Sequence, residues 1–112
     1  MGKVLQIRVM AVTWNYDLVE EEWPRLSALA FSVPVKLNDR GVMEMVRALS
    51  EGLEFMKWSE ERKRIMGPGI REAAAIRTDI EKALADWDPG LANSLSDRLE
   101  DVLDRLERDY TA

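Results

Sequence analysis

The chain has 112 residues, 46% of them hydrophobic and 33% charged, a balance typical of one globular, helix-rich domain rather than a disordered chain. It contains no histidine and no cysteine, which excludes disulfides, catalysis based on His or Cys, and the usual zinc sites. The net charge of −5 argues against non-specific binding to nucleic acid, because such binding depends on neutralising phosphates.

The stretch Lys3–Trp14 is the one long run with β-type alternation, and it predicts a strand. A strand must pair its backbone groups with a neighbour, and one or two strands alone do not make a stable sheet. We therefore expect a homodimer that forms through or near this strand. On the strand, Arg8 either meets a carboxylate in that interface or lies on a solvated face. The side chains expected at the interface are Arg8, Met10, Trp14 and Trp58.

The segment after this strand predicts a helix from about Tyr16 to Ala30, with Asn15 as its N-cap. Pro24 lies inside this pattern and lacks a backbone donor, so the helix must kink there or break and restart at Pro24. Phe31–Leu37 alternates again and is a candidate second strand. Its Pro34 restricts it to an edge strand or an extended connection.

The remaining two thirds of the chain predict helices, over residues 39–54, 59–66, 70–87 and 91–109. The triplet Gly67-Pro68-Gly69 predicts a turn, and Asp88-Pro89-Gly90 predicts another. The last two helices carry apolar stripes at helical spacing and predict an antiparallel αα-hairpin. The predicted fold is α+β, predominantly helical. The single domain, 1–112, divides into a strand–helix–extended unit (1–37), middle helices (38–66) and the αα-hairpin (67–112).

The segment Lys57–Arg71 is the basic exception in an acidic chain. If a helix begins after the Gly-Pro-Gly turn, its free N–H groups and nearby arginines form a candidate site for a phosphate or carboxylate. The alternative is a helix–helix corner with a solvated basic rim. A short helix, a turn and a longer helix also resemble the outline of a helix-turn-helix DNA-binding motif. The residues of the candidate anion site are Arg64, Gly67, Gly69 and Arg71.

The last helix is rich in carboxylates, and Asp97, Asp101 and Asp104 share one face of it. Interspersed arginines and the absence of a calcium-loop motif favour a solvated face over a cation site, so no metal and no cofactor are expected. Trp23 and Trp87 lie on apolar stripes and are predicted to be buried in the core.

The function that these patterns favour is a small, non-catalytic, cytoplasmic interaction or assembly protein. No catalytic constellation is recognisable, so we do not expect an enzyme. The alternatives are a small-ligand or anion-binding regulatory domain at the basic segment, and a helix-turn-helix DNA binder. The N-terminus lacks the pattern of a signal peptide, and no apolar run is long enough to span a membrane.

Overall fold

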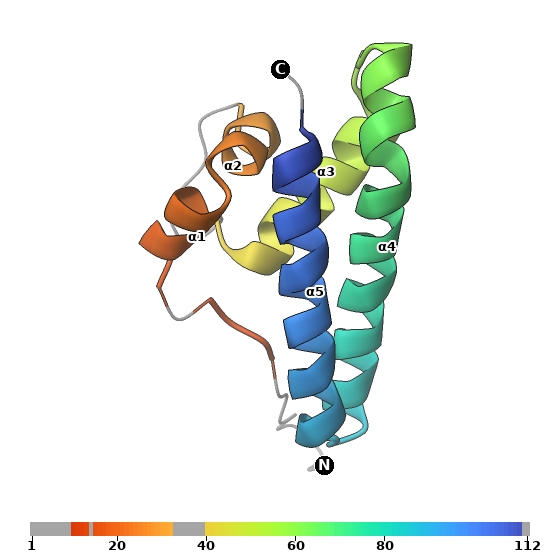
Figure 1. The fold of residues 1–112 in the computed structure, drawn as a ribbon. Coiled ribbons are helices and arrows are strands. Elements are labelled where there is room, and N and C mark those ends of the chain that lie inside the picture. Colours follow the sequence, from red (N-terminus) through yellow and green to blue (C-terminus); the bar gives the residue numbers. More distant parts are fainter. Residues whose placement is uncertain (1–9, 14, 33–39, 111–112) are drawn as a thin grey trace, which may run out of the picture.

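The computed structural model describes residues 10–13, 15–32 and 40–110. Helices make up 80% of these residues, so the described part of the chain is all-α. Figure 1 shows the two longest helices lying side by side, with the shorter ones packed around one end of the pair. The helices are α1 (Asp17–Glu22), α2 (Pro24–Ala30), α3 (Val42–Phe55), α4 (Glu60–Ala85) and α5 (Pro89–Asp109).

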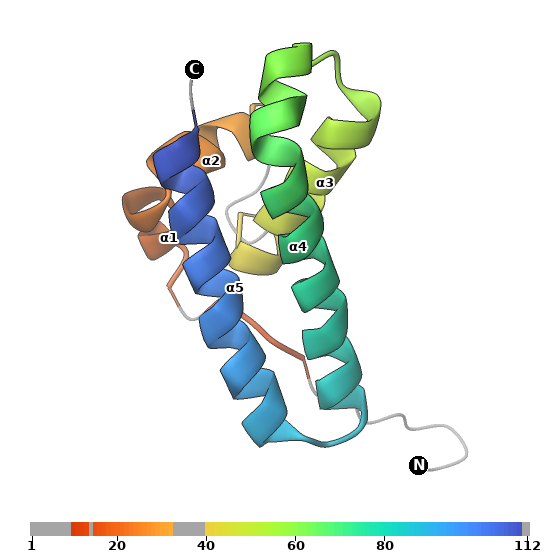
Figure 2. The same cartoon turned by 45° about the vertical axis from the view of Figure 1, so that its right-hand side comes forward.

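The predicted α+β class is wrong. Residues 10–13 are irregular, and no strand occurs anywhere in the part of the chain that the structure describes. At residues 10–13 the alternating sequence forms an extended stretch that lies beside α5 (Figures 1 and 2) and is not part of a paired strand. Residues 3–9 and 14 of the predicted strand lie outside the described residues. Of the second candidate strand, Phe31 is the C-cap of α2 and Ser32 is irregular, and the rest also lies outside.

The predicted αα-hairpin is confirmed: α4 and α5 are antiparallel and pack along their lengths (Figure 2). Their facing stripes are fully buried, and small residues on α4 let the two backbones approach. Burying such a stripe is the main source of stability for a helix pair. The buried residues are Ala73, Ile76, Ile80 and Ala83 on α4, and Ala92, Leu95, Leu99, Val102, Leu103 and Leu106 on α5.

The turn predicted at Gly67-Pro68-Gly69 is absent, because α4 continues through it from Glu60 to Ala85. Pro68 is exposed, and the carbonyl of Arg64, four residues before it, also belongs to an exposed residue, so water can replace the missing N–H donor. Gly69 lies against α5: a Cβ atom on it would be 2.5 Å from Leu106 Cδ2. Close packing of α4 on α5 thus holds a helix that local sequence disfavours.

Of the two outcomes predicted at Pro24, a kink or a break, the structure shows the break, since α1 ends at Glu22 and α2 begins at Pro24. The N-terminus of α2 has no cap from its own chain neighbours. Instead, the carboxylate of Glu107 on α5 accepts hydrogen bonds from the backbone N–H of Arg25 and of Leu26, each at 3.0 Å. Arg25 Nε also donates to Glu107, at 2.7 Å. A carboxylate at a helix N-terminus is favourable for the helix dipole, so this contact fixes α2 onto α5.

The turn between α4 and α5 differs from the predicted one in its key residue. Asp88 N–H donates to Ala83 O, and Trp87 N–H donates to Leu84 O, which together form a Schellman motif. Trp87 occupies its left-handed position, with φ of 58°, where glycine is the usual residue. The prediction that Trp87 is buried is wrong, since its side chain is 67% exposed, whereas the prediction for Trp23 is confirmed.

Candidate functional site

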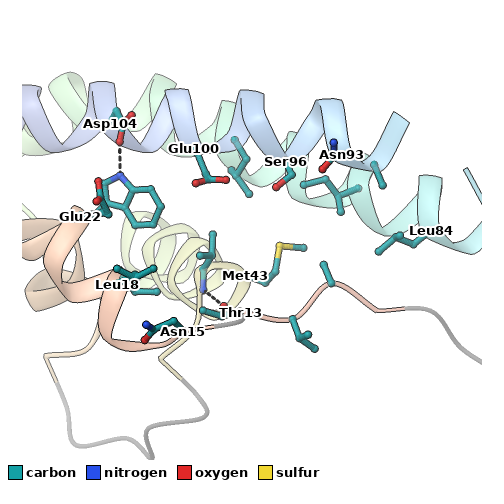
Figure 3. A pocket seen from close by; sticks show the side chains of 18 of the residues that line it. Thr13, Asn15, Leu18, Glu22, Met43, Leu84, Asn93, Ser96, Glu100 and Asp104 are labelled. Atoms are coloured by element: carbon teal, nitrogen blue, oxygen red, sulfur yellow. Dashed lines mark hydrogen bonds between the residues drawn. The ribbon is translucent and has the colours of Figure 1, made fainter. Parts of the chain in front are cut away.

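A groove of about 630 Å³ lies between α1, residues 11–13 and 15, and α5. We call it the α1–α5 groove. Figure 3 shows Leu18 and Asn15 on one side of it and Asn93, Ser96 and Glu100 on the other. Most of its lining is apolar, and we call this apolar lining, wherever it lies in the groove, the apolar floor: Ala11, Val12, Leu18, Val19, Val42, Met43, Ile80, Leu84, Ala92 and Leu99.

Two hydrogen bonds fix the groove's walls. Thr13 Oγ1 accepts from the backbone N–H of Val42 at 2.9 Å, which ties the N-terminal segment to the start of α3. Trp23 Nε1 donates to Asp104 Oδ1 at 2.8 Å, which joins the α1–α2 break to α5 (Figure 3). The Trp23 ring is itself buried, so this bond anchors the end of the groove.

The α5 wall of the groove is acidic. Glu100 and Asp104 on α5 line it, Glu22 on α1 lines the groove from the other side, and none of the lining residues in the described part of the chain is basic. Burial raises the pKa of Glu100, and the neighbouring carboxylates of Asp97, Asp104, Asp101 and Glu22 raise it further. A raised carboxyl pKa means that the ionised form of Glu100 is unfavourable at this position. The groove therefore combines an apolar floor with a surplus of negative charge.

A second, smaller groove of about 510 Å³ lies between the end of α2 and the outer face of α3, and we call it the α2–α3 groove. Two large apolar side chains at its rim are exposed: Phe55 is 79% exposed and Met56 is 54% exposed. Leu29, Phe31 and Trp58 also contribute to its lining. Unlike the first groove, it carries both signs of charge, with Arg47 and Glu51 on α3.

The structure does not assemble the predicted anion site. Gly67 and Gly69 lie inside α4, so their N–H groups are not those of a helix start, and α4 begins instead at Glu60 with Ser59 as its cap. The guanidinium of Arg71 lies over buried Gly67, with Nη1 3.2 Å from where a Cβ atom would be. Arg64 is exposed and lies 4.0 Å from Glu61. The four residues thus follow one helix without converging on a common point.

The helix-turn-helix outline is also lost, because it required a turn at the same triplet. The basic segment around it is largely engaged in local contacts. The Arg62 guanidinium lies 5.8 Å from the Trp58 ring centre and 5.6 Å from that of Tyr110, within the range of cation–π interaction. Lys63 lies 4.0 Å from Glu60. The contact of Arg62 with Tyr110 connects the start of α4 with the end of α5.

The structure does not bring the four predicted interface residues together on one described surface. Arg8 and Trp14 lie outside the described residues. Met10 is 72% exposed near the α1–α5 groove, whereas Trp58 is half-buried, with its ring against Gly52 in the α2–α3 groove. Met10 and Trp58 therefore do not line a common hollow.

Sequence reasoning missed the acidic wall of the α1–α5 groove. Asn93, Ser96, Glu100 and Asp104 repeat at intervals of three or four residues, which places them on one face of α5. That spacing was visible in the sequence, but nothing in the sequence showed that α1 and residues 11–13 and 15 would lie opposite it. Among the described residues, no group of three or more carboxylates could hold a metal ion.

Comparisons with protein-family models, with curated proteins and with solved structures gave no significant match. Within the part of the chain that the structure describes, no helix has the length and apolarity needed to cross a membrane. The groove geometry is therefore the basis on which a function can be proposed.

Proposed function

We propose that the protein is a non-catalytic interaction module, and that its α1–α5 groove binds a cationic amphipathic helix of a partner protein. The observation that carries the proposal is the combination of an apolar floor with an acidic wall in one groove. An amphipathic helix with Lys or Arg along one edge of its apolar face complements both features. Helix-in-groove recognition is a recurrent mode of peptide binding.

The dimensions of the groove support a helical occupant. Its lining on α5 extends from Pro89 to Asp104, which are fifteen residues apart, or about 22 Å along the helix axis. That length accommodates about four turns of a second helix. Binding by strand addition would need an exposed sheet edge, and the described residues contain no strand.

The electrostatics support a cationic occupant. Glu100 lies among carboxylates that raise its pKa, so an incoming cation relieves repulsion that is already present. Charges at the rim mainly set the association rate and the choice of partner, while the apolar floor supplies most of the affinity. The proposal therefore predicts salt-sensitive binding that rejects acidic helices with the same apolar face.

The test uses a designed peptide of about 15 residues with Leu on one face and Lys on the other, titrated into the full chain by calorimetry. A peptide with Glu in place of Lys is the control ligand. We expect the double variant Glu22→Lys/Glu100→Lys to weaken binding of the Lys peptide about 10-fold, since two rim pairs contribute about 0.7 kcal/mol each.

The matched protein control is Glu54→Lys/Glu61→Lys, which makes the same change in net charge at exposed sites outside the groove. It should change affinity by less than about 3-fold. Equal weakening by both double variants would show that only net charge matters. No binding of the Lys peptide at about millimolar concentration, or equal binding of the Glu peptide, would refute the proposal.

A further inference from the structure

The α2–α3 groove has the character of a protein interface of its own. Phe55 and Met56 place two large, mostly exposed apolar side chains next to each other at the end of α3. Leu29 and Phe31 from the end of α2 extend this apolar surface. Clustered exposed apolar side chains with a polar rim are typical of interaction sites, whereas single ones are ordinary.

The charges of this groove distinguish it from the α1–α5 groove. Glu44, Arg47 and Glu51 line it from the outer face of α3. Arg47 Nε lies 3.1 Å from Glu51 Oε1, and both side chains are more than half exposed, so the pair contributes little to the stability of one chain. A surface with an acid and a base four residues apart on one helix is complementary to itself.

We infer that the α2–α3 groove is the surface through which two copies of this chain associate about a two-fold axis. In a two-fold interface the same patch serves both copies, so a contact between two residues occurs twice. With the two α3 helices antiparallel and the axis crossing the outer face of α3 at the level of residue 49, Arg47 of each copy lies opposite Glu51 of the other. The small side chain of Ala48, next to this axis, lets the helices approach.

A second copy fits this surface better than the other occupants do. A cationic helix suits the all-acidic wall of the α1–α5 groove, whereas the α2–α3 groove presents both signs. An anionic membrane surface would require a basic rim, but the groove's acidic residues outnumber its arginine. The inferred interface is independent of the proposed function, since the two grooves share no lining residue.

The test measures self-association of the full chain by sedimentation equilibrium, using variants that separate contacts between chains from those within a chain. Arg47→Glu gives a chain with acidic residues at both positions 47 and 51, and Glu51→Arg gives a chain with arginine at both. Each variant alone should dissociate at least 10-fold more readily than the wild type, because like charges then face each other.

An equimolar mixture of the two variants is the decisive sample. Contacts within each chain stay repulsive in the mixture, whereas both contacts between unlike chains become attractive, so the mixture should associate as tightly as the wild type. Phe55→Ser, at an exposed site that leaves the core intact, should also weaken association about 10-fold.

The control pair is Arg64→Glu and Glu61→Arg, which carries the same charge changes on the exposed face of α4. These two variants should associate as the wild type does. A wild-type chain that is monomeric up to about 100 µM would overturn the inference. A mixture of the two α3 variants that associates no better than either variant alone would also overturn the inference. That result would show that the surface serves a different partner or none.

Discussion

Trp87 offers a direct test of how the hairpin turn is built. The residue holds φ of 58° at the left-handed position of the Schellman motif and is 67% exposed. For an L-residue other than glycine, the left-handed conformation costs about 1–2 kcal/mol. Glycine avoids that cost but loses about 0.5–1 kcal/mol more backbone entropy on folding. Replacing Trp87 by glycine should therefore relieve strain without opening a core cavity.

The informative comparison is between Trp87→Gly and Trp87→Ala. Both remove the same indole ring, but alanine retains a Cβ atom and hence most of the left-handed penalty. We expect the glycine variant to be more stable than the alanine variant by about 1 kcal/mol. For a chain of this size, that difference corresponds to roughly 4 °C in Tm.

The assay is urea unfolding followed by far-UV circular dichroism, which does not depend on tryptophan fluorescence. Ala85→Gly is the control, because Ala85 is the last residue of α4 and has no left-handed strain. That variant should lose up to about 1 kcal/mol. A Trp87→Gly variant no more stable than Trp87→Ala would refute the assignment of left-handed strain to this position.

Two further predictions concern carboxylates of α5. Glu107→Ala should lower the free energy of unfolding by about 2 kcal/mol in urea titration, because it removes both hydrogen bonds that cap α2 and the ion pair with Arg25. The control Glu61→Ala, in an exposed ion pair, should change it by less than about 0.5 kcal/mol. Equal effects of the two substitutions would disprove the capping role of Glu107. The pKa of Glu100 is raised in the folded chain, so the folded state binds a proton at this carboxyl more strongly than the unfolded state does. The contribution of Glu100 to stability therefore falls as the pH rises from the ordinary carboxyl pKa through the raised one. Glu100→Gln should therefore raise Tm at about pH 7 and leave it unchanged at about pH 4; a gain of the same size at both pH values would contradict this assignment.

Several features followed from local sequence chemistry. The stripes of α4 and α5 predicted the hairpin, because apolar residues at helical spacing must be buried against a second element. Pro24 predicted a kink or a break, since proline cannot donate to the preceding turn, and the structure shows the break between α1 and α2. Ser59 and Asp88 precede the two long helices and cap them, with hydrogen bonds from Arg62 N–H and Leu91 N–H.

The acidic wall of the α1–α5 groove could be predicted only as one face of a helix. Carboxylates on a helix face are usually solvated, and α5 by itself gives no reason to expect otherwise. The wall becomes part of a groove because Glu107 and Asp104 hold α2 and Trp23 against α5, contacts between residues about eighty positions apart. Short-range patterns carry no information about contacts at that separation.

The sequence by itself determined the helical hairpin, an interruption of the helix at Pro24 and the exclusion of His- and Cys-based chemistry, because each depends on a residue and its near neighbours. Only the tertiary structure decided that α4 runs through Gly67-Pro68-Gly69, since the approach of Leu106 to Gly69 outweighs the helix-breaking preference of the triplet. It also decided that residues 10–13 lie beside helices instead of pairing in a sheet. Packing between distant segments settles such choices, and it also creates the grooves through which we propose this protein binds its partners.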